Sequence, residues 1–264
     1  IIYGLYYSLL LIMNLILQAI ILGIIQGLTE FLPISSSGHL IIFQILFSTS
    51  VFSPVALSLV LHLGTLLALI VYFIRDWKKF LASRSLIWAI ILATLVTAVL
   101  AFPFKDKIEQ SFNQLQLVGM MLIATAIILY LASRYHQGQP LNRVGYQNAI
   151  IVGAAQALAV IPGLSRSGIT MAFGIFSGLS SSLALQFSFL LAIPTILGST
   201  LLEIQEVASA VMVSFWPLLS GFLAAFLTGL LTIHWLTKFL SLNQKNLIYF
   251  AVYCFLLGII ILIF

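Results

Sequence analysis

The 264-residue chain is 62% hydrophobic and only 6% charged, with a formal net charge of +5. A soluble domain carries about a quarter of its residues as Asp, Glu, Lys and Arg, so this composition excludes a water-soluble globular protein and predicts one that crosses a membrane several times. The basic excess lies mostly in short loops, which favours a role in membrane topology over a nucleic-acid surface.

The N-terminal part of the chain leads into an interrupted apolar segment, residues 15–49. The first residues have no basic region and no small-residue cleavage site, so they are predicted to be mature membrane sequence rather than a signal peptide. Within 15–49, a proline and a run of serines interrupt the apolar sequence (FLPISSSGHL). Each half is expected to be too short to cross alone, which predicts a re-entrant or broken helix pair.

The rest of the chain alternates continuous and interrupted apolar segments. A second interrupted segment, residues 146–180, contains VIPGLSRSGIT and is also predicted to be a broken pair. Continuous runs of about 18–20 residues, long enough to cross a bilayer, are predicted at 56–74, 86–104, 115–133, 184–201, 209–236 and 247–264. The expected fold is therefore all-α and polytopic, with about ten helical segments in a single membrane domain, residues 1–264.

The loop charges predict an orientation. Placing the basic loops in the cytoplasm satisfies the positive-inside rule, and the acidic turn at 202–208 then lies outside. These loops contain Arg75, Lys78, Lys79, Arg84, Arg134, Arg143, Lys238 and Lys245. The two broken pairs then enter from opposite faces.

An internal repeat accounts for this inversion. When the chain is shifted by 130 residues against itself, scarce polar residues coincide without a gap; the matched pairs include Gln26 with Gln156, Ser35 with Ser165, Ser37 with Ser167, Gly38 with Gly168, Ser58 with Ser188 and Thr65 with Thr195. Two inverted repeats are predicted, about 15–133 and 145–264. Inverted repeats with broken helices place polar sites near the midplane, where the halves meet.

The two halves differ in their ionisable groups. At equivalent positions, the first half has Glu30, Ser36 and His39, and the second half has Val160, Arg166 and Ile169. Ionisable groups inside a membrane are costly and usually functional. A structural ion pair of Glu30 and Arg166 is the simplest alternative, but apolar packing often replaces such a pair without loss of stability.

The residue types favour phosphate chemistry. Arg166 lies between two serines just before a helical run, where its guanidinium and backbone N–H groups would bind an anion. Gln26 and Glu30 share a helix face and offer oxygens to a hard cation. Ser36 and His39 would make a nucleophile and base pair, and Glu30 is an alternative base. His62, in an unbroken span, is interpreted as a packed or supporting residue.

The motifs QGLTEFLPISSSGH and PGLSRSGIT closely resemble the two signatures of the undecaprenyl-diphosphate phosphatase family, also known as bacitracin-resistance proteins. The resemblance extends over essentially the whole chain from about residue 15. It implies hydrolysis of undecaprenyl diphosphate to undecaprenyl phosphate and phosphate, which recycles the cell-wall lipid carrier, and bacitracin acts on the same substrate. It also implies a bacterial inner membrane, a site open to the periplasmic side, and dependence on Mg²⁺ or Ca²⁺.

The resemblance assigns roles to individual residues. Glu30, Ser36 and His39 are the expected catalytic residues, with Ser36 as nucleophile, and Gln26 and Glu30 are the expected metal ligands. The expected diphosphate-binding residues are Arg166, Ser165, Ser167, Gly168, Ser35, Ser37 and Thr170. Gln at the first position of the motif leaves one fewer negative charge for a metal. The sequence leaves open whether Ser36 forms a phospho-enzyme, and which of Glu30 and His39 is the base.

Two other function classes are compatible with parts of the sequence. A secondary transporter or lipid flippase fits the inverted repeats. An intramembrane serine protease fits the Gly, Ser and His residues but explains neither Arg166 nor Glu30. The sequence also leaves the oligomeric state open, a homodimer included.

Overall fold

The protein is helical throughout the part of the chain that the computed structural model describes, residues 2–47, 54–111, 114–136 and 138–264. Within these ranges there is no strand, only an isolated bridge between Leu141 and Leu179. The α-helices are α1 (Ile2–Thr29), α2 (Ser36–Phe47), α3 (Pro54–Tyr72), α4 (Trp77–Ala82), α5 (Arg84–Ala101), α6 (Lys105–Ser111), α7 (Leu115–Arg134), α8 (Tyr146–Leu158), α9 (Arg166–Phe176), α10 (Ser181–Leu202), α11 (Ile204–Leu242) and α12 (Leu247–Ile263). Two short 3₁₀ turns, Phe102–Phe104 and Gln244–Asn246, complete the set.

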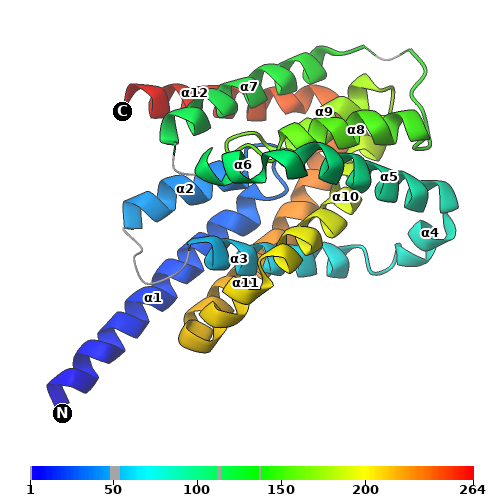
Figure 1. Ribbon diagram of the computed structural model, residues 1–264. Helices are drawn as coiled ribbons and strands as arrows, with labels where there is room; N and C mark the ends of the chain where they lie inside the picture. Colours follow the sequence, from blue (N-terminus) through cyan, green and yellow to red (C-terminus); the bar gives the residue numbers. More distant parts are fainter. Residues whose placement is uncertain (1, 48–53, 112–113, 137) are drawn as a thin grey trace.

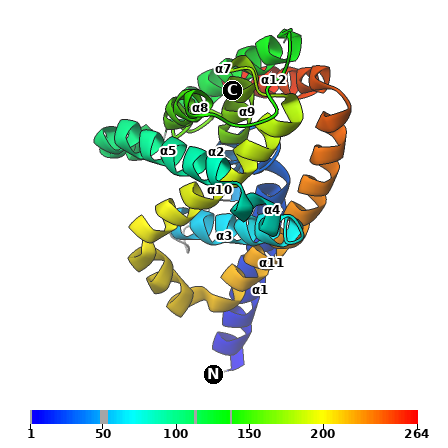
Figure 2. The ribbon, with the colours of Figure 1, turned by 90° about the vertical axis from the view of Figure 1, so that its right-hand side faces the viewer.

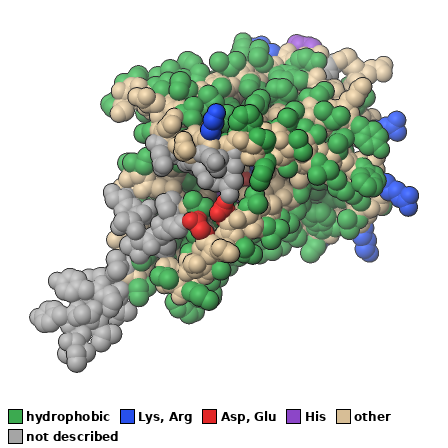
Figure 3. All heavy atoms as spheres, in the orientation of Figure 1, with side chains coloured by type: hydrophobic (Ala, Val, Ile, Leu, Met, Phe, Trp, Pro, Cys, Tyr) green, Lys and Arg blue, Asp and Glu red, His purple; other side chains and the backbone are tan. Residues whose placement is uncertain are grey.

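Long apolar helices confirm the prediction of an all-α protein that crosses the membrane several times. In the described residues, 7 helices are long and apolar enough to span a bilayer. Hydrophobic side chains cover most of the face drawn in Figure 3, with few charged groups among them. Such a surface is stable only in lipid.

Two helices differ in length from the prediction. Helix α1 has 28 residues, and its stretch Ile12–Thr29 is long enough to cross alone, so the expectation that each half of the first broken pair is too short is wrong for α1. No proline interrupts residues 2–29, and the helix therefore continues. Helix α11 has 39 residues and kinks at Ser214 (φ −136°, ψ 44°), close to Pro217. In the second broken pair, α8 with 13 residues and α9 with 11 are short, as predicted.

The helix packing follows the repeat. Helix α1 packs on α11, and α8 packs on α5, which are equivalent pairs under the 130-residue shift. Helices α7 and α12 are equivalent to each other and lie side by side (Figures 1 and 2). They approach closely because small residues face each other: a Cβ atom on Gly119 would lie 3.1 Å from the carbonyl oxygen of Gly258. Close backbone contact of this kind is typical of helices packed in membranes.

Candidate active site

The two broken helix pairs meet tip to tip. We define the first tip as residues 30–39, between α1 and α2, and the second tip as residues 160–169, between α8 and α9. A Cβ atom on Gly38 would lie 3.6 Å from the Cα of Gly163, and a Cβ on Gly168 would lie 3.1 Å from the Cβ of Pro33. The 130-residue shift places Pro33 on Gly163 and Gly38 on Gly168, so the two contacts are equivalent to each other. The tips are therefore related by the pseudo-twofold axis of the repeat.

Each tip starts its second helix with the same serine cap. Ser35 Oγ accepts a hydrogen bond from the backbone N–H of Gly38 at 3.3 Å, and Ser165 Oγ accepts one from Gly168 at 3.2 Å. In both tips another serine hydroxyl lies 3.3 Å from the capping hydroxyl. Serine is favoured at this position because its oxygen satisfies an N–H group that the helix leaves without a partner.

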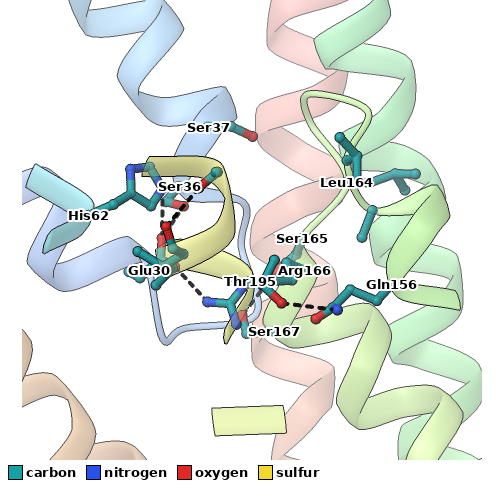
Figure 4. Close-up of a pocket in the computed structure, with 14 residues that line it drawn as sticks. Glu30, Ser36, Ser37, His62, Gln156, Leu164, Ser165, Arg166, Ser167 and Thr195 are labelled. Carbon is teal, nitrogen blue, oxygen red and sulfur yellow. Dashed lines mark hydrogen bonds and ion pairs between the residues drawn. The ribbon is translucent and has the colours of Figure 1, made fainter. Parts of the chain in front are cut away.

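Glu30 is the hub where the two tips are joined. Its Oε1 accepts from Arg166 Nη2 at 2.5 Å. Its Oε2 accepts from Ser36 Oγ at 2.6 Å and lies 3.3 Å from His62 Nε2 (Figure 4). The same oxygen accepts from Gln26 Nε2 at 2.9 Å. The carboxyl is only 4% exposed. An isolated buried carboxylate would be strongly disfavoured, so these partners allow Glu30 to be ionised here.

His62 supplies a second cation-forming group beside Glu30. Its Nδ1 lies 2.7 Å from the carbonyl oxygen of Ser58, and a carbonyl can only accept, so Nδ1 carries a hydrogen. Its Nε2 then donates to Glu30 only when the ring carries hydrogens on both nitrogens. The single carboxylate can therefore be flanked by two cations, which leaves room for an anionic ligand.

A pocket opens beside this hub. It has a volume of about 170 Å³ and is lined by Glu30, Ser36, Ser37, His62, Gln156, Ala159, Val160, Leu164, Ser165, Arg166, Ser167, Thr195, Ile196 and Ser199. Pockets for whole small molecules are larger, about 300–1,000 Å³. The pocket therefore suits a head group, with any long apolar chain left outside in the lipid.

The structure brings together about half of the residues predicted for the site. Those that line the pocket are Glu30, Ser36, Ser37, Ser165, Arg166 and Ser167. Ser35 and Gly168 lie beside it as parts of the helix caps. Thr170 is buried, and its hydroxyl lies 2.6 Å from Ser188 Oγ, so it holds α9 against α10.

His39 does not reach Ser36 as a base would. Its Nδ1 lies 2.7 Å from the carbonyl oxygen of Ser35, and its Nε2 lies 2.7 Å from the hydroxyl of Tyr253 on α12. It is buried and is absent from the pocket lining in the described residues. In this arrangement Ser36 donates to Glu30, so Glu30 is the better placed of the two candidate bases.

The polar groups that the sequence interpretation did not place in the site come from α3, α8 and α10. His62 on α3 was interpreted as a packed or supporting residue, but it lines the pocket and contacts Glu30. The signal was its presence as an ionisable group inside an apolar span. Gln156 and Thr195 also line the pocket, and both are among the polar residues matched by the repeat.

Gln26 and Glu30 are not arranged as a pair of metal ligands. Gln26 turns its amide nitrogen toward Glu30, and its Oε1 is buried without a hydrogen-bond partner in the described structure. Both oxygens of Glu30 are already engaged by Arg166, Ser36 and Gln26. The described residues also contain no cluster of three His, Cys, Asp or Glu side chains. This donor set does not fit a divalent cation held by the protein alone.

Comparisons with known proteins identify the family. Residues 19–260 match the family described as "Bacitracin resistance protein BacA". The chain is 37% identical to the undecaprenyl-diphosphatase of Methanobrevibacter smithii, covering 93% of this chain and 96% of that protein. It is 37% identical to undecaprenyl-diphosphatase 1 of Shouchella clausii (94% and 96%) and 38% identical to the undecaprenyl-diphosphatase of Syntrophotalea carbinolica (92% and 96%). The similarity that the two tip motifs indicated is thus confirmed, and the chain belongs to the bacitracin resistance protein family.

Proposed function

We infer that this chain hydrolyses undecaprenyl diphosphate to undecaprenyl phosphate and inorganic phosphate. The names of its relatives support this activity. The observation that carries it is the contact of both the Ser36 hydroxyl and the Arg166 guanidinium with one buried carboxylate, Glu30. A nucleophile, a base and an anion-binding cation thus lie in one pocket of a membrane protein, as hydrolysis of a lipid diphosphate requires.

The proposed first step uses Ser36 as the nucleophile. Its Oγ attacks the terminal phosphorus while Glu30 Oε2, 2.6 Å away, takes the hydroxyl proton. The bond from the terminal phosphorus to the bridging oxygen breaks, and undecaprenyl phosphate leaves. The leaving undecaprenyl phosphate takes the proton from Glu30, which becomes a carboxylate again. Water then attacks the phosphorus of the phosphoserine and gives a proton to Glu30. The bond from phosphorus to Ser36 Oγ breaks, Glu30 returns the proton to this oxygen, and inorganic phosphate leaves.

The second tip would bind the diphosphate. Arg166 has five N–H donors and uses one nitrogen on Glu30, so others are available to phosphate oxygens. The hydroxyl-bearing residues Ser37, Ser165 and Ser167 line the same pocket. Helices α2 and α9 both begin here, and the N-terminal end of a helix favours negative charge. The charge that develops on the transferred phosphoryl group is then opposed from both tips.

We further propose that a divalent cation, Mg²⁺ or Ca²⁺, enters the pocket on the diphosphate rather than on a preformed protein site. The support is the poor fit of Gln26 and Glu30 as ligands. Chelation should then lower activity, whereas calorimetry of the substrate-free protein should detect no tight binding of either ion. Tight binding without substrate would contradict this part of the proposal.

The proposed location is the bacterial inner membrane, with the pocket open to the outer, periplasmic side. Thr195, Ile196 and Ser199 line the pocket from the last turns of α10. That end of α10 leads into Glu203 and the first turn of α11, which bears Glu206. This stretch has no Lys or Arg, so the positive-inside rule places it outside. A Glu206→Cys variant should react with an impermeant maleimide added to intact cells, whereas Arg84→Cys, the control from a basic loop, should not. The opposite labelling would invert the topology.

Phosphate release by purified protein in detergent tests the activity. With undecaprenyl diphosphate and no ion gradient, an enzyme releases phosphate continuously, whereas a transporter or flippase would release none. The relatives' names give no support to the transporter alternative. Bacitracin would inhibit by binding the same lipid. A homodimer stays a prediction, which a detergent-corrected mass measurement would decide.

A further inference from the structure

Ser35 has an unusual backbone conformation next to the proposed nucleophile. In the described residues it is the only non-glycine with positive φ, at +70°. The equivalent Ser165 has an ordinary extended conformation, with φ −77° and ψ 111°. L-residues disfavour the left-handed region, and such a conformation persists only where surrounding contacts hold it.

The side chain of His39 contacts this peptide. Its Nδ1 lies 2.7 Å from the carbonyl oxygen of Ser35, and because a carbonyl only accepts, Nδ1 carries the hydrogen. In the neutral ring Nε2 is then an acceptor, and the hydroxyl of Tyr253 at 2.7 Å donates to it. The two rings lie nearly parallel, 7° apart in plane with centroids 5.7 Å apart. The Ser35 carbonyl therefore fixes the tautomer of His39, and Tyr253 helps to fix the orientation of its ring.

The second tip has neither feature. At the position of His39 it has Ile169, which is 2% exposed and packs with Ala155 and Leu164. The imidazole and the left-handed serine thus occur together, and only on the tip that bears Ser36. Ser36 follows Ser35 directly, so the Ser35 peptide sets the direction from which the Ser36 hydroxyl meets Glu30.

We propose that His39 and Tyr253 are positioning residues that hold the Ser35 peptide in its left-handed conformation and so aim the Ser36 hydroxyl at Glu30. Both ring nitrogens of His39 are engaged in this task, and neither is free to take the proton of Ser36. The inference rests on the proposed role of Ser36 as nucleophile. Helix α12 then helps to set the geometry of the first tip, because Tyr253 lies on it.

A set of conservative variants tests the proposal by phosphate release. Tyr253→Phe removes only a hydroxyl and should lower kcat about 3- to 10-fold, the effect of one lost hydrogen bond, with little change in KM. His39→Asn places an amide nitrogen where Nδ1 lies, so it can still donate to the Ser35 carbonyl, but it cannot take a proton. It should retain at least about tenfold more activity than His39→Ala, which has no donor. Tyr249→Phe, on the same helix and in ring contact with Phe239, is the matched control and should behave as wild type.

Combined variants and pH profiles separate positioning from catalysis. Adding Tyr253→Phe to His39→Asn should cause no further loss, because the shorter side chain does not extend to Tyr253. The shape of the kcat profile against pH should be the same in His39→Asn as in wild type, since the proposal gives His39 no proton transfer. Each variant is checked for wild-type elution and thermal stability in detergent.

Two outcomes would overturn the proposal. If folded His39→Asn is as inactive as His39→Ala, His39 acts through proton transfer. If Tyr253→Phe has the kcat of wild type, Tyr253 has no positioning role, and this result is available even if the His39 variants fold poorly. Full activity of Ser36→Ala would instead remove the nucleophile on which the inference rests, so the two failures can be told apart.

Discussion

The first and second tips share a backbone plan and differ in chemistry. Both start a helix with a serine that caps the N–H of a glycine three residues later, Gly38 or Gly168. The first tip, however, carries the carboxylate, the hydroxyl and the imidazole, and the second carries the guanidinium. The pairing of Glu30 with Arg166 therefore joins the two repeats as well as neutralising a buried charge.

The comparison teaches that symmetry provides the scaffold and its loss provides the site. A strict repeat would give both tips the same set of groups, so neither tip could differ from the other in charge or in chemistry. Dividing the charges gives one tip that would react and one that would bind. Substitutions on and beside the two tips can test what each difference contributes.

Ser36→Ala should have the largest effect, because it removes the proposed nucleophile, which the second tip lacks. Turnover should fall by at least about a thousandfold, as when other catalytic serines are removed. Phosphate release is the measurement. Ser220→Ala is the control, since that hydroxyl only donates to the Pro217 carbonyl of its own helix. Activity near wild type would eliminate Ser36 as nucleophile.

Arg166→Lys should come next. Lysine keeps the charge but loses the planar array of donors, so it cannot bind Glu30 and a phosphate oxygen in the same geometry. Losing a hydrogen bond to a charged group costs about 1.5–3 kcal/mol, which is roughly a 10- to 150-fold loss in kcat/KM. Arg134→Lys, whose guanidinium lies over the Tyr130 ring, is the matched control. If Arg166→Lys were fully active, a single positive charge at this position would be enough to bind the phosphate, and the planar array of donors would not be needed.

His62 tests whether the reaction needs a fourth partner for Glu30, besides Arg166, Ser36 and Gln26. His62→Leu removes the donor from Oε2 and should lower kcat/KM about tenfold, whereas His62→Gln keeps an N–H donor and should lose only about two- to threefold. His234→Gln, at an imidazole that contacts the Tyr72 ring, is the control. If Leu and Gln at position 62 gave the same activity, the contact of 3.3 Å with Glu30 would have no role in the reaction.

The sequence predicted the plan of the molecule better than the contacts of its site. Apolar length located the continuous spans, and scarce polar residues at a fixed offset revealed that Ser35 and Ser165 are equivalent. The sequence interpretation gave the ion pair of Glu30 with Arg166 only as an alternative, whereas the structure contains it. An unpaired buried charge is strongly unfavourable, and this argument favoured the pair. The resemblance carried by the two tip motifs was confirmed by the match to the family and by the similarity to its members.

Partners from distant helices could not be predicted in this way. His39 and Ser36 are three apart, which suggested a pair, but spacing does not determine where an imidazole finds its second partner. That partner, Tyr253, lies 214 residues away on α12. His62 is equivalent to Ala192 in the second repeat, which is not ionisable. The comparison of the two repeats therefore did not predict a role for His62 in the site. Both contacts arise from tertiary packing, which helical periodicity does not encode.

The smallest predicted effect concerns the anchoring of the second tip. Thr125 Oγ1 accepts from the backbone N–H of Ser165 at 3.1 Å and lies 3.3 Å from the Gly163 carbonyl, whereas the first tip is joined to its neighbouring helix through His39, 2.7 Å from the Tyr253 hydroxyl. Thr125→Val keeps the shape but leaves the buried Ser165 N–H without a partner. It should cost about 1–3 kcal/mol of stability and a few-fold in activity. Thermal unfolding in detergent is the measurement, with Thr94→Val as control because Thr94 donates only to Ile90 in its own helix. Equal melting of the two variants would show that the second tip does not depend on the Thr125 hydroxyl for its stability.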